Sequence, residues 1–306
     1  MVKAWSFDAL AARCDSVIRH SGTQQLAQTG LIEQGKTASK TAVEPARYLR
    51  DLHAQEASGA EVRSLLPAKH KAALDSGGSV SLDWGAVASD GNIKTYLGHW
   101  DIFRYLPSTA TEWAPLASST WPRSSLHWDF AWAGPSGTFT GLHYDMPNNW
   151  FFQMRGVKEL VMFGRDQKQH LPISAKYDPG ARLACVDVTR LDDSNQGDAA
   201  IIDSFTAASG WYVRLHPGDA LFIPKQTYHV VHALSPSLSV SSFGHSPLEL
   251  VTNGAWIETR DALHRAGLLG WGNCACHGAN ERRPRIGLAI AGATLAAALH
   301  FNRLGS

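Results

Sequence analysis

The spacing of apolar residues divides the chain into a helical beginning, a strand-rich middle and a helical end. In the first 75 residues, apolar positions recur at helical intervals, as in "FDALAARCDSVIRH" and the proline-interrupted "AEVRSLLPAKHKAALD". From about residue 94, short aromatic and β-branched runs such as "NWFFQM", "KELVMF" and "SLSVSSF" alternate with Gly, Pro and Asn. Closely spaced short strands of this kind predict an antiparallel barrel or sandwich.

These changes of pattern predict three regions and an all-β core with flanking helices. Residues 1–93 are expected to form a helical region that packs on the barrel. Residues 94–246 are expected to form the barrel, and residues 247–306 a C-terminal helical region. The polar stretch 165–200 is expected to be a long insertion at the barrel rim.

An uncharged run of small residues, 286–299, lies between Arg283, Arg285 and Arg303. It has 14 residues, whereas a membrane-spanning helix needs about 20 apolar residues. A buried or dimerisation helix is therefore preferred, with a short tail anchor as the alternative. The first residues lack the apolar stretch of a secretory signal, so a cytoplasmic location is expected.

Charge and cysteine content narrow the class of function. The net charge is +1, from 28 basic and 27 acidic residues, so nothing electrostatic indicates a nucleic-acid partner. Four scattered cysteines are too few for a disulfide framework and suit a reducing compartment. Cys274, Cys276 and His277 lie close together, but a zinc site would need a second ligand pair, so free cysteines are expected.

Candidate chemistry comes from a His-x-Asp spacing that the sequence contains three times. The pairs are His99 and Asp101, His127 and Asp129, and His143 and Asp145. On a strand, residues i and i+2 share a face, so such a pair would enter the barrel interior together. A second histidine from another strand would complete the two-histidine, one-carboxylate set that is diagnostic of non-haem Fe(II) oxygenases.

The first two pairs have ordinary interpretations. Around His99 and Asp101, neither strand face is clearly apolar, so their orientation stays open. His127 and Asp129 alternate with three aromatic residues in "LHWDFAW", which predicts buried aromatics and an outward-facing pair. For both pairs, a polar strand face or a loop is the expected setting.

The third pair is followed by a strand, a tight turn and a returning strand, "VKELVMF". In that return strand, Lys158 shares a face with Leu160 and Met162, because residues two apart point the same way. A lysine on a buried apolar face needs an anion. The alternative is that Lys158 lies at the strand end and extends to water.

A distant histidine supplies the third candidate ligand. His229 follows a Pro-Gly-Asp turn and a short apolar strand, 86 residues after His143, which is ample for another strand of the same barrel. His232 competes for this role, but on a continuous strand it would face the opposite way. His216 precedes the turn and is expected to be a loop residue.

Together these segments resemble the JmjC, or cupin-8, group of Fe(II)/2-oxoglutarate oxygenases, most closely the factor-inhibiting-HIF-type hydroxylases. The resemblance covers roughly residues 94–245 and implies a double-stranded β-helix, or jelly-roll cupin barrel. Its specific part is His-x-Asp, a lysine 15 residues after the histidine, and Pro-Gly-Asp…Ile-Pro-x4-His. The same offset from His99 and His127 reaches Ala114 and Leu142, so only the third pair fits.

The resemblance also implies roles for individual residues. His143, Asp145 and His229 match the iron ligands. Lys158 matches the lysine that pairs with the distal carboxylate of 2-oxoglutarate, and Thr140 matches a hydroxyl that bonds the same carboxylate.

The resemblance also implies which residues line the cosubstrate pocket. Tyr96 is matched to another hydroxyl on that carboxylate, and Asn149 to an asparagine that lines the cosubstrate pocket. Ser242 stands where the closest pattern has a second asparagine. The aromatic candidates for shielding the site, with ordinary barrel core as the alternative, are Trp132, Trp150 and Phe151.

The implied activity is decarboxylation of 2-oxoglutarate to succinate, with Fe(II) and dioxygen, coupled to hydroxylation of a protein or peptide side chain. Two alternatives remain: an oxygenase acting on small molecules, and a metal-binding cupin without catalysis. A histone demethylase is not favoured, because nothing in the sequence resembles a chromatin-reading module. The helical segment 247–266 is a candidate for pairing two copies of the chain.

Overall fold

The computed structural model describes residues 4–21, 25–29, 39–66, 81–88, 95–122, 125–177, 181–190, 199–271 and 273–274. The apolar run 286–299 and two of the candidate zinc ligands, Cys276 and His277, lie outside these residues. Cys274 is described and buried, with its thiol free of any disulfide. Within the described part, no helix has the length and apolar composition that a membrane span requires.

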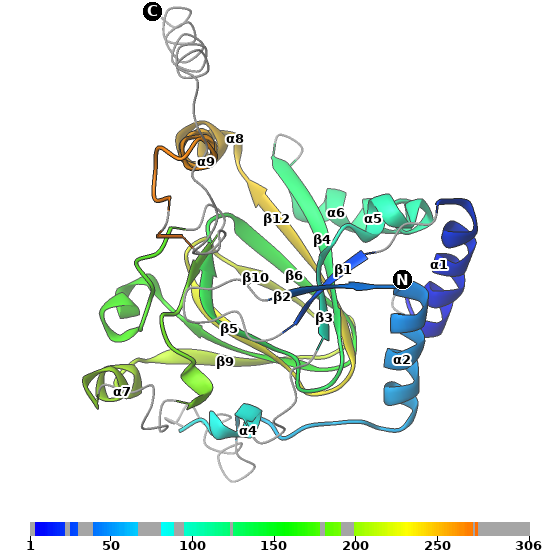
Figure 1. Cartoon of the computed structure of the whole chain (residues 1–306), viewed down its shortest axis with the longest axis horizontal. Coiled ribbons are helices and arrows are strands. Elements are labelled where there is room, and N and C mark those ends of the chain that lie inside the picture. The colour runs from blue at the N-terminus through cyan, green and yellow to red at the C-terminus, as the bar shows by residue number, and fades with distance from the viewer. Residues whose placement is uncertain are drawn as a thin grey trace, which may run out of the picture.

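Two antiparallel sheets form the barrel (Figure 1). The seven-stranded sheet contains, in order, β10 (Ala220–Ile223), β6 (Asn148–Arg155), β12 (Ser237–His245), β4 (Leu126–Gly134), β3 (Thr95–Trp100), β1 (Gln25–Thr29) and β2 (Ser39–Val43). The five-stranded sheet contains β8 (Ala181–Leu183), β5 (Phe139–Asp145), β11 (Tyr228–Ala233), β7 (Lys158–Phe163) and β9 (Gly210–Leu215). From β4 to β7 the chain alternates between the sheets, as in a jelly roll, which confirms the predicted fold class.

Helices surround this barrel. Beside the seven-stranded sheet lie α1 (Phe7–Ser21), α2 (Pro45–Ala57), α5 (Ile102–Tyr105) and α6 (Pro107–Thr120) (Figure 1). Shorter elements interrupt the rest of the chain: α4 (Gly85–Ala88), the 3-10 helices η2 (Arg165–His170) and η3 (Val188–Arg190), and α7 (Ala199–Thr206). After β12 come α8 (Pro247–Glu249), the π-helical η4 (Leu250–Gly254) and α9 (Ala255–Arg265).

The largest hydrophobic core lies outside the barrel, between the seven-stranded sheet and these helices. In β12, Leu238 and Val240 belong to this core together with Trp5 and Leu49 from the N-terminal region. The alternate residues of β12 are serines, and Ser239 contacts a side chain inside the barrel. Alternation therefore places apolar residues against the helices and small polar residues toward the interior, which leaves room for a polar site.

The structure differs from the sequence-based regions in two places. The N-terminal region, expected to be helical, also contributes β1 and β2, which extend the seven-stranded sheet. These strands, "QLAQT" and "SKTAV", are short and rich in polar residues, as sheet-edge strands commonly are. The expected rim insertion, 165–200, contains β8, which pairs with β5 directly opposite His143.

Candidate metal centre

Three potential ligands converge at one end of the five-stranded sheet. His143 and Asp145 share a face of β5, and His229 on β11 lies directly across from His143. Nε2 of His143 lies 3.8 Å from one oxygen of Asp145, and Nε2 of His229 lies 3.7 Å from the other. One ligand atom from each residue lies within 4.8 Å of the others, the separation that a shared metal ion requires.

Backbone carbonyls fix the tautomer of both histidines. Nδ1 of His143 lies 2.8 Å from the carbonyl oxygen of Gly141, and Nδ1 of His229 lies 2.9 Å from that of Thr227. Because a carbonyl can only accept, each Nδ1 carries the proton and each Nε2 presents a lone pair toward Asp145. Metal-binding histidines are typically oriented by this kind of second hydrogen bond.

The electrostatics of the three residues also favour a cation. Burial and the neighbouring His143 lower the pKa of His229 to about 3, so this imidazole is neutral at physiological pH. Burial raises the pKa of Asp145, although His143 opposes the shift. Two imidazoles and a desolvated carboxylate form a donor set that fits ferrous iron, which would supply the missing positive charge.

A β-bulge brings Thr140 into the same cavity as the triad. His229 pairs with His143, but Val231 pairs with Thr140, so β5 contains one more residue than β11 over this stretch. An extra residue reverses the phase of a strand. Thr140 and His143 therefore both face the interior although they are three residues apart.

Lys158 lies in the barrel interior with polar partners from two other strands. Its side chain is 1% exposed, which excludes the alternative that it extends to water. Its Nζ donates to Oγ of Ser239 at 2.7 Å and to the hydroxyl of Tyr96 at 3.3 Å. Tyr96 is in turn hydrogen-bonded to Thr140. Four hydrogen-bonding groups thus converge on one part of the cavity.

Among the described residues, this group of side chains has no anion beside it. Burial lowers the pKa of Lys158 to about 7, because within the described residues no carboxylate meets its ammonium group. Burial likewise raises the pKa of Tyr96, which keeps its hydroxyl neutral. A carboxylate bound here would restore the charge of Lys158 and accept hydrogen bonds from Tyr96 and Thr140, so the residues fit one end of a keto diacid.

Three of the other candidate lining residues face the barrel interior. Phe151 lies 5.4 Å from Lys158 Nζ, and the rings of Trp132 and Tyr96 are 5.7 Å apart, so both aromatics belong to the interior. Asn149 donates to Oγ of Ser241 at 3.4 Å. Its Oδ1 is buried without a partner among the described residues, which leaves an acceptor available to a polar ligand.

Ser242 and Trp150 are not brought to this pocket. Oγ of Ser242 accepts a hydrogen bond from Trp121 Nε1 at 2.8 Å on the outer face of β12. Trp150 packs against Phe222, with ring centroids 5.1 Å apart, and against the outer core. The expectation for Ser242 is therefore corrected: its phase on β12 is opposite to that of Ser239, whose inward position sequence reasoning missed.

The aspartates of the two remaining His-x-Asp pairs have structural roles. Asp101 caps α5 by accepting from the backbone N–H of Arg104, and Asp129 accepts from Trp113 Nε1 at 2.9 Å. His99 is different. Its φ of +48° and a register shift in β3 turn the ring onto Trp132, with centroids 4.3 Å apart. The glycine before it, Gly98, was the available signal for a bulge.

Comparisons with known proteins agree with this architecture. Residues 33–247 match the family described as "Cupin-like domain". Jumonji C domain-containing protein 5 of Drosophila melanogaster is 30% identical over 112 residues, 36% of this chain and 26% of that protein. For lysine-specific demethylase 8 of Danio rerio the identity is 32% over 111 residues, 36% of this chain and 26% of that protein.

A third relative is named for a different process. The tRNA wybutosine-synthesizing protein 5 of Danio rerio is 29% identical over 108 residues, 35% of this chain and 30% of that protein. The aligned segments span about a quarter to a third of these relatives. The family match, by contrast, extends from residue 33 to residue 247 and includes all the site residues discussed above. The chain therefore belongs to the cupin-like family of the JmjC type.

Proposed function

We propose that the chain is an Fe(II)- and 2-oxoglutarate-dependent oxygenase that hydroxylates a C–H bond of a protein or peptide side chain. The observation that carries this proposal is the presence of two complementary groups in one barrel. His143, Asp145 and His229 would hold the iron. Lys158 and Tyr96, with Thr140, would receive the distal carboxylate of 2-oxoglutarate.

The bound iron, with 2-oxoglutarate and dioxygen, would supply the oxidative chemistry that protein side chains lack. The residues of the chain bind and orient. The carbonyl bonds to His143 and His229 hold both rings with Nε2 toward the metal position. Lys158 fixes the far end of the cosubstrate, while Phe151 and Trp132 exclude water from its surroundings.

A row of aromatic side chains supports a peptide rather than a very small substrate. Trp128, Phe130 and Trp132 alternate along β4, and therefore follow one face from the pocket toward the rim. Trp132 lies inside against Tyr96, whereas Trp128 is 36% exposed. Aromatic residues at a pocket entrance are typical of surfaces that bind polypeptides.

Turnover without a substrate is the direct test. The protein is incubated aerobically with Fe(II), ascorbate and 2-oxoglutarate, and succinate is measured by proton NMR, with a metal-free reaction as control. Succinate that depends on iron is expected, and its formation should accelerate when the reaction is supplied with a peptide library. Absence of succinate from a protein that binds Mn(II) normally would indicate the non-catalytic cupin instead. Acceleration by small metabolites alone would indicate the small-molecule oxygenase.

We also propose that two copies pair through the C-terminal helices. Leu248, Val251 and Trp256 are 73%, 73% and 59% exposed and lie within the segment that follows β12. Trp256→Glu is expected to shift the molar mass measured by light scattering from dimer to monomer, because a carboxylate cannot be buried in an apolar interface. Trp211→Glu, at a 61% exposed tryptophan on β9, is the matched control and should leave the mass unchanged. A monomeric wild-type protein would contradict the proposal.

A further inference from the structure

His99 has an uncommon backbone conformation. Its φ of +48° lies in the left-handed region, which few residues other than glycine adopt. Strand β3 advances three residues between two successive pairs with β4, whereas β4 advances two, so β3 contains an extra residue at this point. Leu97 and Trp100, on either side of the extra residue, both belong to the outer core. The bulge therefore releases His99 from the regular alternation of the strand.

The ring of His99 lies on aromatic side chains of the inner face of β4. Its centroid is 4.3 Å from that of Trp132 and 5.5 Å from that of Phe130, which it meets edge-on at 80°. His99 is nonetheless an exposed residue. The two aromatic contacts thus hold the ring in place while part of it stays accessible from solvent.

His99 also lies across the barrel from the candidate metal ligands. It belongs to the seven-stranded sheet, whereas Asp145 belongs to the five-stranded sheet. Burial raises the pKa of Asp145, while His143 and His99 lower it. The imidazole of His99 is therefore close enough to act on this carboxylate across the cavity. A molecule that enters between the two sheets to reach the metal position passes His99.

A second strained residue lies on the other side of Asp145. Among the described residues other than glycine, only His99 and Gln226 have a positive φ. Gln226, with a φ of +62°, donates its backbone N–H to the carbonyl oxygen of Asp145 at 2.8 Å. Strained backbone of this kind concentrates at functional sites, where a side chain must be held in one place. Both strained residues therefore draw attention to the surroundings of Asp145.

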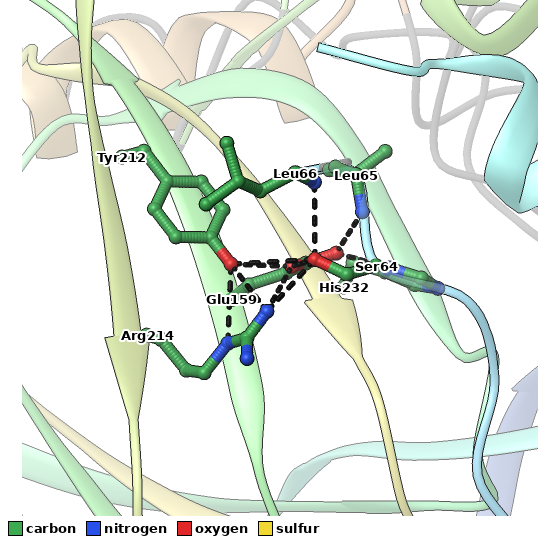
Figure 2. Close-up of polar contacts among 7 residues, drawn as sticks. All are labelled: Ser64, Leu65, Leu66, Glu159, Tyr212, Arg214 and His232. Carbon is green, nitrogen blue, oxygen red and sulfur yellow. Dashed lines mark hydrogen bonds and ion pairs between the residues drawn. The ribbon is translucent and has the colours of Figure 1, made fainter. Parts of the chain in front are cut away.

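The polar network on the outer face of the five-stranded sheet has a different character. Figure 2 shows the carboxylate of Glu159, on the face of β7 opposite Lys158, at the centre of a hydrogen-bond network. It accepts from Ser64 at 2.6 Å, from Tyr212 at 2.7 Å and from the backbone N–H of Leu65 at 2.7 Å. Glu159 is 0% exposed, so its carboxylate anchors the segment around Ser64 and cannot contact a substrate.

We propose that His99 is a specificity-determining residue that contacts the peptide substrate beside the metal and donates a hydrogen bond to one of its carbonyl oxygens. An imidazole has at least one N–H donor whether it is neutral or charged, and every residue of a peptide carries a carbonyl acceptor. Because Trp132 and Phe130 already hold the ring, little side-chain entropy is lost on binding. This inference rests on the proposed function, since it assigns a further residue to the same site.

Peptide binding without turnover tests the contact. Protein loaded with Mn(II) and 2-oxoglutarate is applied under anaerobic conditions to an array of peptides of random sequence, and the affinity for retained peptides is measured by fluorescence anisotropy. His99→Ala is expected to weaken binding about tenfold, the equivalent of one hydrogen bond. His99→Asn keeps an N–H donor and tolerates the left-handed backbone, so it should retain most of the wild-type affinity.

Three further variants separate the contact from stability. His99→Gly relieves the backbone and should melt a few degrees higher than His99→Ala, yet both should bind peptides equally weakly. Ser64→Ala removes a hydrogen bond to Glu159 and should lower the melting temperature without reducing peptide affinity. His127→Ala removes a histidine that stacks on Trp121 instead, and should bind peptides as the wild type does.

The outcomes distinguish this inference from the proposed function. The role of His99 is overturned by equal peptide affinity in the wild type and His99→Ala, by an equal loss in Ser64→Ala or His127→Ala, or by a wild-type protein that binds no peptide. Absence of iron-dependent succinate from a wild-type protein that binds peptides through His99 would instead contradict the proposed function alone.

Discussion

Replacing Asp145 with asparagine is expected to lower the affinity for Mn(II) by more than about 100-fold, as titrated by electron paramagnetic resonance. Mutating a residue that only hydrogen-bonds to a metal ligand already costs about 10- to 100-fold in affinity, and Asp145 would be a ligand itself. The carboxylate lies between both imidazoles, 3.8 Å and 3.7 Å from their Nε2 atoms. Asparagine has nearly the same shape but lacks the negative charge that holds a divalent cation. Succinate formation should be lost together with metal binding.

The chain contains matched controls for this substitution. Asp101→Asn and Asp129→Asn make the same change at the same His-x-Asp spacing, at residues that bond to Arg104 and Trp113 instead. Asparagine remains a good helix cap, so Asp101→Asn should also be neutral for folding. Unchanged Mn(II) affinity in Asp145→Asn, or an equal loss in either control, would refute the assignment of the metal centre.

Replacing Lys158 with methionine is expected to weaken binding of 2-oxoglutarate by about 30-fold to 5000-fold, corresponding to the roughly 2–5 kcal/mol lost when one partner of a buried charge pair is removed. Methionine retains the length and the contacts with Phe151, but it has no ammonium group. Binding is measured calorimetrically with Mn(II) present under anaerobic conditions. Mn(II) affinity itself should be unchanged, which separates this site from the metal ligands.

The same substitution should stabilise the ligand-free protein near neutral pH. Burial lowers the pKa of Lys158 from 10.5 to about 7. Between these values the unfolded chain holds a proton that the folded chain does not, so wild-type stability rises with pH by up to about 1.4 kcal/mol per unit. Urea denaturation should therefore find Lys158→Met more stable at pH 6, with the difference shrinking toward pH 10. Parallel pH profiles would contradict a buried, uncompensated ammonium group.

Strand periodicity made part of the site predictable. The two-residue repeat assigns Lys158 to the same face as Leu160 and Met162, and His143 to the face of Asp145, whatever their partner strands are. It also separates His229 from His232, which the structure places on opposite faces of β11. These relations are local, and the resemblance to the JmjC group then connected the two distant segments.

Register and long-range contacts were not predictable in the same way. The inward position of Thr140 and the packing of His99 on Trp132 depend on extra residues in β5 and β3, and an extra residue is defined only relative to the neighbouring strand. A glycine beside each, Gly141 and Gly98, was the available signal. The network around Glu159 is still less visible, because its partner Ser64 is 95 residues away in an irregular segment.

The extra residue in β5 has an evolutionary consequence. Loss of one codon at Gly141 would restore a strict two-residue repeat, in which Thr140 stands two residues before His143 and still faces the interior. His143 and Asp145 would keep their places opposite β11, and Phe139 would stay on the outer face. A descendant of this chain could therefore lose the extra residue by a single deletion while its candidate metal ligands and Thr140 remained on the same faces.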